Sequence, residues 1–462
     1  MTKDQNSYSY SAVNKHENNH EGKQFQEEIT ESAPTIGIRH LQVLIYFLLC
    51  ITAFGFRVSL SVGIVAMTDP STTNNPDIPT YPEWKNKNVI LSAFFWGYII
   101  PQVFAVQSIL SALIPETAAR YGSRGVMISR ALQGFTQGFI YPSLTHLLSQ
   151  WAPTEERSRL GTIVYAAAPF GTVIAILVTG LISSSWYGWP LVFYLYGALG
   201  LLWCVMMIIL GYDSPAEHPK ITKAEKLYIE KSLGHTDEKP NHPTPWKSIF
   251  TSIPLWALFA TQLGFNYCFW TMLTQIPMYM NFVMNFNIKQ NSVLSSLPYL
   301  TLWLLSFAFG FLSDALVNKN VISRTKSRKI FNSIGLLVPA GALIMLGYTK
   351  SDEYKQAVVL LVISVGFTSA CYSGWTVNHM DLSPNHAGTL MGITNGFSQV
   401  TGAIAPLVVQ LLVTNERDPL QWRFIFLITA GFNIITGIIF DVFGSAKVQP
   451  WNSPEEDEEK GH

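Results

Sequence analysis

Apolar segments of membrane-spanning length, separated by short polar stretches, make up most of this chain. Read with a window of about 19 residues, the sequence contains eleven such segments: 41–67, 89–114, 126–148, 161–184, 190–211, 253–281, 293–313, 330–348, 356–377, 388–413 and 422–443. A polar stretch at 212–252, rich in Lys, Glu, His and Pro, divides them into two groups. The pattern predicts an all-α, multi-pass membrane protein with two helical bundles joined by a central loop.

The predicted organisation has five parts. They are a disordered cytoplasmic tail (1–38), an N-terminal bundle (39–211), a central cytoplasmic loop (212–252), a C-terminal bundle (253–443) and an acidic cytoplasmic tail (444–462). The first tail has no apolar core through Ala33, so we do not expect a cleavable signal peptide. A basic loop near 319–329 predicts the cytoplasmic side of the C-terminal bundle.

Composition supports a membrane protein and narrows its function. Hydrophobic residues make up 48% of the chain and charged residues 13%, about half the charged share of a typical soluble domain. The formal net charge is zero, so we expect no nucleic-acid partner. The four cysteines all lie in apolar segments, where helix packing is a better explanation than a disulfide framework.

The sequence contains no pattern that indicates catalysis. A phosphate loop of the Gly-x-x-x-x-Gly-Lys-Ser/Thr type is absent, which argues against ATP as the energy source. Histidines in 217–243 lack metal-ligand spacing. We therefore expect no enzyme activity, no metal site and no cofactor.

Two arginines lie in apolar segments. Arg57 is within the first predicted span, and Arg130 opens the apolar stretch Arg-Ala-Leu-Gln-Gly-Phe-Thr-Gln-Gly-Phe-Ile-Tyr-Pro. A guanidinium in hydrocarbon costs at least ~2.5 kcal/mol and normally faces a bundle interior or a watery cavity. Both arginines are therefore candidates for binding phosphate or carboxylate oxygens. The alternative for each is an interfacial side chain that extends to the membrane surface.

Several longer motifs resemble one transporter family. They are Phe56–Met67, Phe94–Tyr98, Arg130–Arg159, Asn378–Gly388, Leu390–Asn395 and Gln449–Asn452. These stretches look like the anion:cation symporter family of the major facilitator superfamily, which includes type I sodium/phosphate cotransporters, sialin and vesicular glutamate transporters. Their sequences are most similar to those of insect inorganic phosphate cotransporters. The resemblance covers about 39–452 and implies a fold of two six-helix bundles around a midplane site.

The resemblance also marks polar residues for substrate binding and ion coupling. Asn266 matches a family asparagine, and Asn395 lies in another matching motif; each could bind substrate or join helices. Gln137 and Gln275 stand where relatives often have Glu, and because an amide carries no proton, they favour coupling to sodium or membrane potential over protons. His146, a third candidate for ion coupling, lies one position after the family's histidine. Because one residue turns a helix by about 100°, the alternative is that His146 faces lipid or a neighbouring helix.

A second group of charged residues belongs to loops that change conformation in such transporters. It comprises Glu156, Arg157, Arg159 and Asp314. The first three follow the span that begins near Arg130, and Asp314 ends the segment Gly310-Phe-Leu-Ser-Asp. We expect these residues to act in conformational change rather than in substrate binding.

The run 89–114 departs from the family pattern. Relatives carry two spans and a cytoplasmic loop in this place, whereas 26 residues form one helix of only about 39 Å. One crossing, or one crossing plus a broken stub, fits this length, and roughly twenty residues are missing relative to two spans and a turn. A single crossing would put the N-terminus outside and give eleven spans. A splice form or gene-model error of a twelve-span carrier is one explanation, and a working eleven-span variant is the other.

We therefore predict a secondary active transporter of inorganic phosphate or small organic anions that works by alternating access and is coupled to sodium. The alternatives are a non-transporting shortened isoform and a proton- or potential-driven vesicular carrier. The expected partners are a small anionic substrate and the lipid bilayer, with the chain acting as a monomer. The plasma membrane and vesicular or lysosomal membranes are the expected locations.

Overall fold

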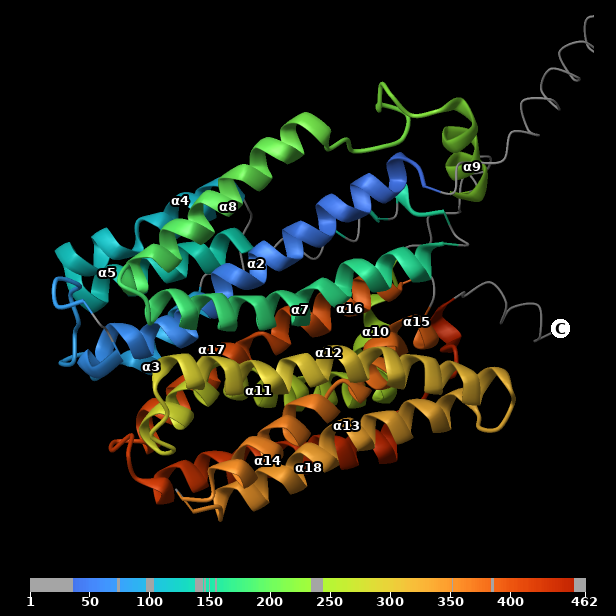
Figure 1. The fold of residues 1–462 in the computed structure, drawn as a ribbon. Coiled ribbons are helices and arrows are strands. Elements are labelled where there is room, and N and C mark those ends of the chain that lie inside the picture. The colour runs from blue at the N-terminus through green and yellow to red at the C-terminus, as the bar shows by residue number, and fades with distance from the viewer. Residues whose placement is uncertain are drawn as a thin grey trace, which may run out of the picture.

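The fold is described from a computed structural model. It covers residues 36–452 apart from 73–74, 97–103, 138–143, 145–146, 149, 154–155, 234–243, 351 and 384–385. Helices supply the regular structure, and no strand occurs among these residues. The helices run roughly side by side and form two bundles (Figure 1). The predicted all-α fold of two bundles is confirmed.

The N-terminal bundle is built around α2 (Ile38–Thr68), which contacts α7 (Arg157–Ser183) and α8 (Gly188–Leu210). Its other described helices are α3 (Lys87–Trp96), α4 (Phe104–Ala112) and α5 (Ile114–Gln137). Helix α2 has 31 residues, about 46 Å at 1.5 Å per residue, and thus exceeds the hydrocarbon thickness of a bilayer. A short 3₁₀ turn, Pro70–Thr72, follows it.

The C-terminal bundle holds six helical segments in sequence. They are α11 (Ile253–Phe282), α12 (Ile288–Asn318), α13 (Arg324–Gly347), α14 (Tyr354–Phe367) with the π-helix Tyr372–Thr376 and α15 (Val377–Leu382), α16 (Ala387–Ser398) with α17 (Val400–Leu412), and α18 (Pro419–Phe443). A 3₁₀ turn at Pro450–Asn452 follows. Side chains of Asn287, Ser323 and Asp418 accept backbone N–H bonds at the starts of α12, α13 and α18, which explains why these helices begin there.

Seven helical segments in the described part of the chain are long and apolar enough to cross a membrane. They are Ile38–Thr68, Ile163–Ser183, Gly188–Leu210, Gln290–Asn318, Arg324–Gly347, Tyr354–Leu382 and Pro419–Phe443. Each overlaps a segment predicted from the hydropathy pattern. The bundles meet along α7 and α12 and along α3 and α17.

The two ends of the molecule differ. The turn between α12 and α13, the start of α2 and helix α9 (Lys223–Leu233) lie at one end, together with the C-terminal end of the chain (Figure 1). We call this the inner end, because its basic loop predicts the cytoplasmic side. The opposite end, which carries the loops that follow α2 and α17, is the outer end.

In the shortened run the structure describes α3 up to Trp96 and α4 from Phe104. Residues 97–103 between them lie outside the described part. Asn86 Nδ2, before α3, donates a 3.2 Å hydrogen bond to Ser123 Oγ, just after α5 bends at Gly122 (φ 57°).

The chain thus returns to the outer end from which it left, because a hydrogen bond cannot join residues on opposite sides of a bilayer. The number of crossings in 89–114 stays a prediction, because residues 97–103 lie outside the described part of the chain. The arrangement with a broken stub fits the described residues. The start of α2 lies at the inner end with α9 and the basic loop (Figure 1).

Candidate functional site

Arg57 lies midway along the molecule, where the two bundles face each other. Its side chain comes from α2 and is 8% exposed. The guanidinium carbon lies 4.8 Å from the ring centroid of Trp270 in α11 and 5.4 Å from that of Phe54. Its Nε donates to Gln137 Oε1 at 3.2 Å. These contacts place a guanidinium, a group suited to phosphate and carboxylate oxygens, between the two bundles.

Arg130 lies next to Arg57 but points at backbone. Its side chain is 2% exposed. Nη1 donates to Phe56 O at 2.9 Å and to Gln133 Oε1 at 2.8 Å, and Nη2 donates to Arg57 O at 3.1 Å. The structure brings the two predicted arginines together, and this geometry makes Arg130 a positioning residue for the segment of α2 that carries Arg57.

The two glutamines join helices on either side of this pair. Gln137 accepts from Arg57 and donates from Nε2 to Ala53 O at 2.7 Å, so it links α5 to α2. Gln275 donates to Asn88 Oδ1 at 2.9 Å and thereby links α11 to α3. His146, the third predicted coupling residue, lies outside the described residues.

The predicted asparagines belong to the C-terminal bundle. Asn266 Nδ2 donates to Ser398 Oγ at 2.8 Å, which joins α11 to the end of α16. Asn395 Oδ1 receives hydrogen bonds from Gln262 at 3.4 Å and Gln399 at 3.2 Å. Because Asn266 and Trp270 are four residues apart on α11, they share a helix face, the face from which Trp270 reaches Arg57.

The predicted conformational residues have different surroundings. Glu156 directly precedes α7 and forms an ion pair with Arg39 at 2.8 Å. Arg157 and Arg159 belong to the first turn of α7, and their side chains lie outside the described part. Asp314 is exposed on α12.

In the C-terminal bundle, the ion pair at the inner end is made by Asp381 rather than by Asp314. Arg328 Nε contacts Asp381 Oδ2 at 2.7 Å, and Arg324 lies 3.7 Å away. Arg328 also donates to Ser373 O at 3.0 Å. The sequence shows Arg328 in a basic loop and Asp381 in a family motif, but no sequence pattern predicts that these two residues form an ion pair.

Polar contacts join the bundles at the outer end. Lys87 Nζ lies 2.7 Å from Glu416 Oε2, and Asn281 Nδ2 donates to Asp69 Oδ2 at 3.1 Å. Gln410 Nε2 donates to Lys85 O at 2.8 Å, and Ser92 Oγ donates to Ala403 O at 2.9 Å. Together with the Gln275–Asn88 bond, these contacts hold the outer end of the molecule closed.

Comparisons with known proteins give one consistent result. The model of the Major Facilitator Superfamily matches residues 44–406. The "Putative inorganic phosphate cotransporter" of Drosophila ananassae is 36% identical over 455 aligned positions, covering 90% of this chain and 94% of the relative. Human sialin is 34% identical, covering 91% and 92%, and the vesicular glutamate transporter 2.1 of Danio rerio is 35% identical, covering 88% and 74%.

A solved structure with a similar fold is a bacterial homologue of the human lysosomal transporter Spinster, in an inward-facing and unoccupied conformation. It covers 90% of this chain and all of its own, with a TM-score of 0.62 and 14% identity. The alignment with the Drosophila ananassae protein also contains positions that this chain lacks. Because 90% of 462 residues is about 416, roughly 39 of its 455 positions have no residue in this chain.

Proposed function

Since the chain belongs to the Major Facilitator Superfamily, we propose that it is a secondary active transporter that carries inorganic phosphate or a small organic anion by alternating access. The chain is a multi-pass membrane protein, and its relatives are transporters rather than enzymes. The proposed substrate class follows from the names of those relatives and from the charge of the site. We place the transporter in the plasma membrane or in a vesicular or lysosomal membrane.

The observation that carries this proposal is Arg57. Its guanidinium is buried between the two bundles, where it contacts Gln137, Trp270 and Phe54, and a guanidinium is well suited to bind phosphate or carboxylate oxygens. A second guanidinium, that of Arg130, lies beside it and holds its backbone. Two buried cations are costly in a low-dielectric interior, and an anion that binds there offsets this cost.

The mechanism has Arg57 as the group that binds the anion. Its stacking on Trp270 means that the binding arginine touches both bundles, so an anion held there can influence how the bundles pack. The outer-end contacts, Lys87–Glu416 and Asn281–Asp69 among them, would have to break for the site to open outward. In alternating access, the bundles would then form new contacts with each other at the inner end as the outer-end contacts break.

We propose sodium as the coupling ion. Gln137 binds Arg57 and Gln275 binds Asn88, and both are amides in buried positions where a carboxylate would be a natural proton carrier. The membrane potential is the alternative drive, worth ~2.3 kcal/mol per charge for each 100 mV.

Uptake by the purified chain in proteoliposomes tests the proposal. We expect an inward sodium gradient to drive uptake of radiolabelled phosphate or of a small carboxylate, and Arg57→Ala to abolish it. Arg423→Ala is the matched control, because Arg423 also stacks on a ring (Tyr348, 4.5 Å) and donates to a carbonyl (Gly347, 2.7 Å) but lies at the outer edge of α18. Full uptake driven by a pH step alone, with sodium absent and voltage clamped, would contradict sodium coupling.

A second candidate function is a non-transporting, shortened isoform that associates with a full-length carrier. The observation in its favour is the length of the run 89–114, which has 26 residues where two spans and a turn need about 40. Restoring about twenty residues after Val106 separates the two functions. Uptake that appears only in the lengthened chain supports the isoform, and equal uptake by both chains excludes it.

A further inference from the structure

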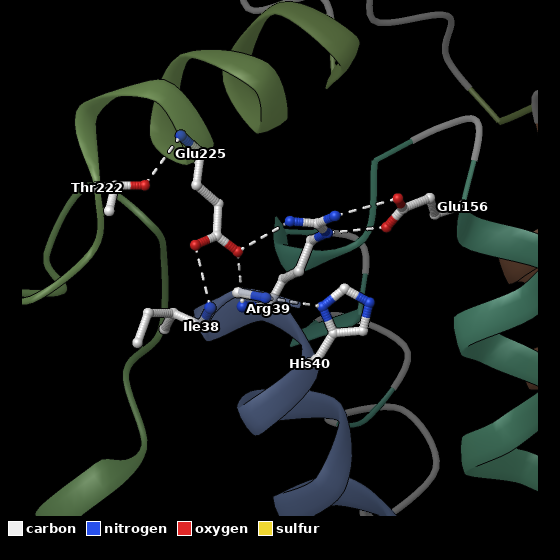
Figure 2. Close-up of polar contacts among 7 residues, drawn as sticks. Ile38, Arg39, His40, Glu156, Thr222 and Glu225 are labelled. Carbon is white, nitrogen blue, oxygen red and sulfur yellow. Dashed lines mark hydrogen bonds and ion pairs between the residues drawn. The ribbon is translucent and has the colours of Figure 1, made fainter. Parts of the chain in front are cut away.

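One buried guanidinium connects three elements at the inner end of the N-terminal bundle. Arg39, in the first turn of α2, is 2% exposed. Its Nε and Nη2 contact the two carboxylate oxygens of Glu156 at 2.8 and 3.1 Å, and its Nη1 contacts Glu225 Oε1 at 3.1 Å (Figure 2). Glu156 begins α7, whereas Glu225 belongs to α9 in the central segment. The side chain of Arg39 therefore ties α2, α7 and α9 together.

Glu225 also caps α2. Its Oε2 accepts the backbone N–H of Ile38 at 3.0 Å, and its Oε1 accepts that of Arg39 at 3.1 Å (Figure 2). The first N–H groups of a helix have no partner within the helix and favour a negative charge. Here the carboxylate comes from a residue 186 positions away in the sequence, and its side chain is 1% exposed.

The backbone at Gly37 leaves room for this carboxylate. A Cβ at position 37 would overlap the carboxylate atoms of Glu225. Any larger residue there must displace Glu225 or the start of α2. Glu225 is itself held in place at the start of α9, where its N–H donates to Thr222 Oγ1 at 3.3 Å.

Apolar packing places α9 in the N-terminal bundle and the next helix in the C-terminal bundle. Ile229 of α9 is fully buried in a cluster with residues of α2 and α7, and Tyr228 lies over Arg39 at 5.5 Å. Helix α10 (Trp246–Thr251) instead buries Ile249 against the start of α11. Trp256 of α11 donates to Phe250 O at 2.8 Å.

We infer that the central segment is divided between the two moving bodies of the transporter, with α9 locked to the N-terminal bundle by the Glu225–Arg39–Glu156 cluster and α10 fixed to the C-terminal bundle. This inference rests on the proposed alternating access. Helices α9 and α10 should then move relative to each other during transport, each with its own bundle.

The consequence is that α9 moves with α2. The Arg39 and Glu225 side chains are 3% and 1% exposed, so loss of either partner removes a buried, charge-assisted contact. Release of Glu225 would also remove the cap of α2. The docked position of α9 should therefore persist whether the outer end is open or closed.

Distances between spin labels in lipid nanodiscs test this inference. One pair, at exposed positions Ile36 and Lys231, measures α9 against the start of α2, and a second pair, at Lys231 and Val321, measures α9 against the C-terminal bundle. Both pairs are placed in the full chain with Cys204 replaced by Ser, and inorganic phosphate with sodium is the probe. The variants are Glu225→Gln and Gly37→Ala, and the matched control is Glu230→Gln, which removes a partly exposed carboxylate from the same helix.

We expect a single narrow distance for Ile36–Lys231 with and without phosphate. Glu225→Gln and Gly37→Ala should raise the undocked population at least about tenfold, as the loss of one charge-assisted hydrogen bond predicts, and Glu230→Gln should leave it unchanged. A broad Ile36–Lys231 distribution in the parent chain would overturn the inference, as would a narrow one in both variants. If phosphate leaves the Lys231–Val321 distance unchanged while the first pair behaves as expected, the proposed phosphate transport fails and the docking of α9 stands.

Discussion

Replacing Arg130 with Lys separates a positioning role from direct substrate binding. Arg130 donates to the carbonyls of Phe56 and Arg57 and to the side chain of Gln133, at 2.9, 3.1 and 2.8 Å. Lys keeps the charge, but its single ammonium lacks the planar fork that reaches two carbonyls and an amide together. We therefore expect the variant to lose about two of these hydrogen bonds.

The magnitude follows from the chemistry of those bonds. A hydrogen bond to a charged group contributes about 1.5–3 kcal/mol. The two carbonyls lie inside α2 and also accept helical N–H groups, so their loss leaves no unsatisfied acceptor, and the lower value applies. Arg130→Lys should thus lower the free energy of unfolding by about 3 kcal/mol. Arg57→Lys leaves the Arg130 contacts intact, and because its ammonium keeps the charge and can donate to Gln137, it should cost less stability than Arg130→Lys.

Thermal unfolding in detergent and initial uptake rates in proteoliposomes measure the two effects separately. We expect Arg130→Lys to lower both stability and uptake, and Arg57→Lys to raise the KM for the anion by about tenfold or more while stability stays near that of the parent chain. The reasoning is refuted if Arg130→Lys abolishes uptake without any loss of stability, because Arg130 would then bind substrate directly. Unchanged uptake in both variants would remove the pair from the site.

Three further predictions concern the outer end and the topology. Breaking the partly exposed Lys87–Glu416 pair by Lys87→Ala costs about 1 kcal/mol and should raise labelling of a cysteine at Asn281 by an impermeant thiol reagent about fivefold; unchanged labelling would mean that the pair does not hold the outer end. Burial alone would raise the pKa of Asp69, but hydrogen bonds from Ser71 and Asn281 hold this pKa below its ordinary value. The contact between Asp69 and Asn281 is therefore lost only as pH falls through that lowered pKa. The thermal stability of the native chain at pH 5 should therefore match that at pH 7 as far as Asp69 is concerned, and a loss of stability at pH 5 that Asp69→Asn abolishes would contradict this sign. Epitope tags at the two chain ends should be accessible from the same side of the membrane, and surface abundance should be lower than that of a lengthened twelve-span version; tags on opposite sides would contradict the returning run.

The sequence predicted the fold because the relevant signal is local. An apolar segment of about twenty residues specifies a span wherever it packs, and the helices overlap the predicted segments, as α2 and α18 show. The shortage of residues in 89–114 was also visible, since length alone limits how far a helix can reach. The contact between Asn86 and Ser123 joins the two sides of that run, and no local pattern contains it.

In the candidate functional site, too, some features follow from local sequence and others only from tertiary contacts. An arginine in an apolar segment must find polar partners inside the protein, and this requirement singled out Arg57 and Arg130 from the sequence. Their different roles depend on which atoms lie within hydrogen-bonding distance, and those atoms come from helices 73–80 residues apart in the chain. Trp270 and the outer-end partners of Lys87 and Asn281 were missed for the same reason.

The amino-acid sequence by itself thus determined the helical, membrane-spanning class of this protein and the presence of buried cations. Only the tertiary structure decided that Arg130 holds backbone, that the shortened run returns to the outer end, and that Glu225 caps a helix 186 residues before it. Hydropathy and charge are properties of short segments and can be read along the chain. Hydrogen bonds and ion pairs act over about 3 Å, so they are fixed only when packing has brought distant segments together.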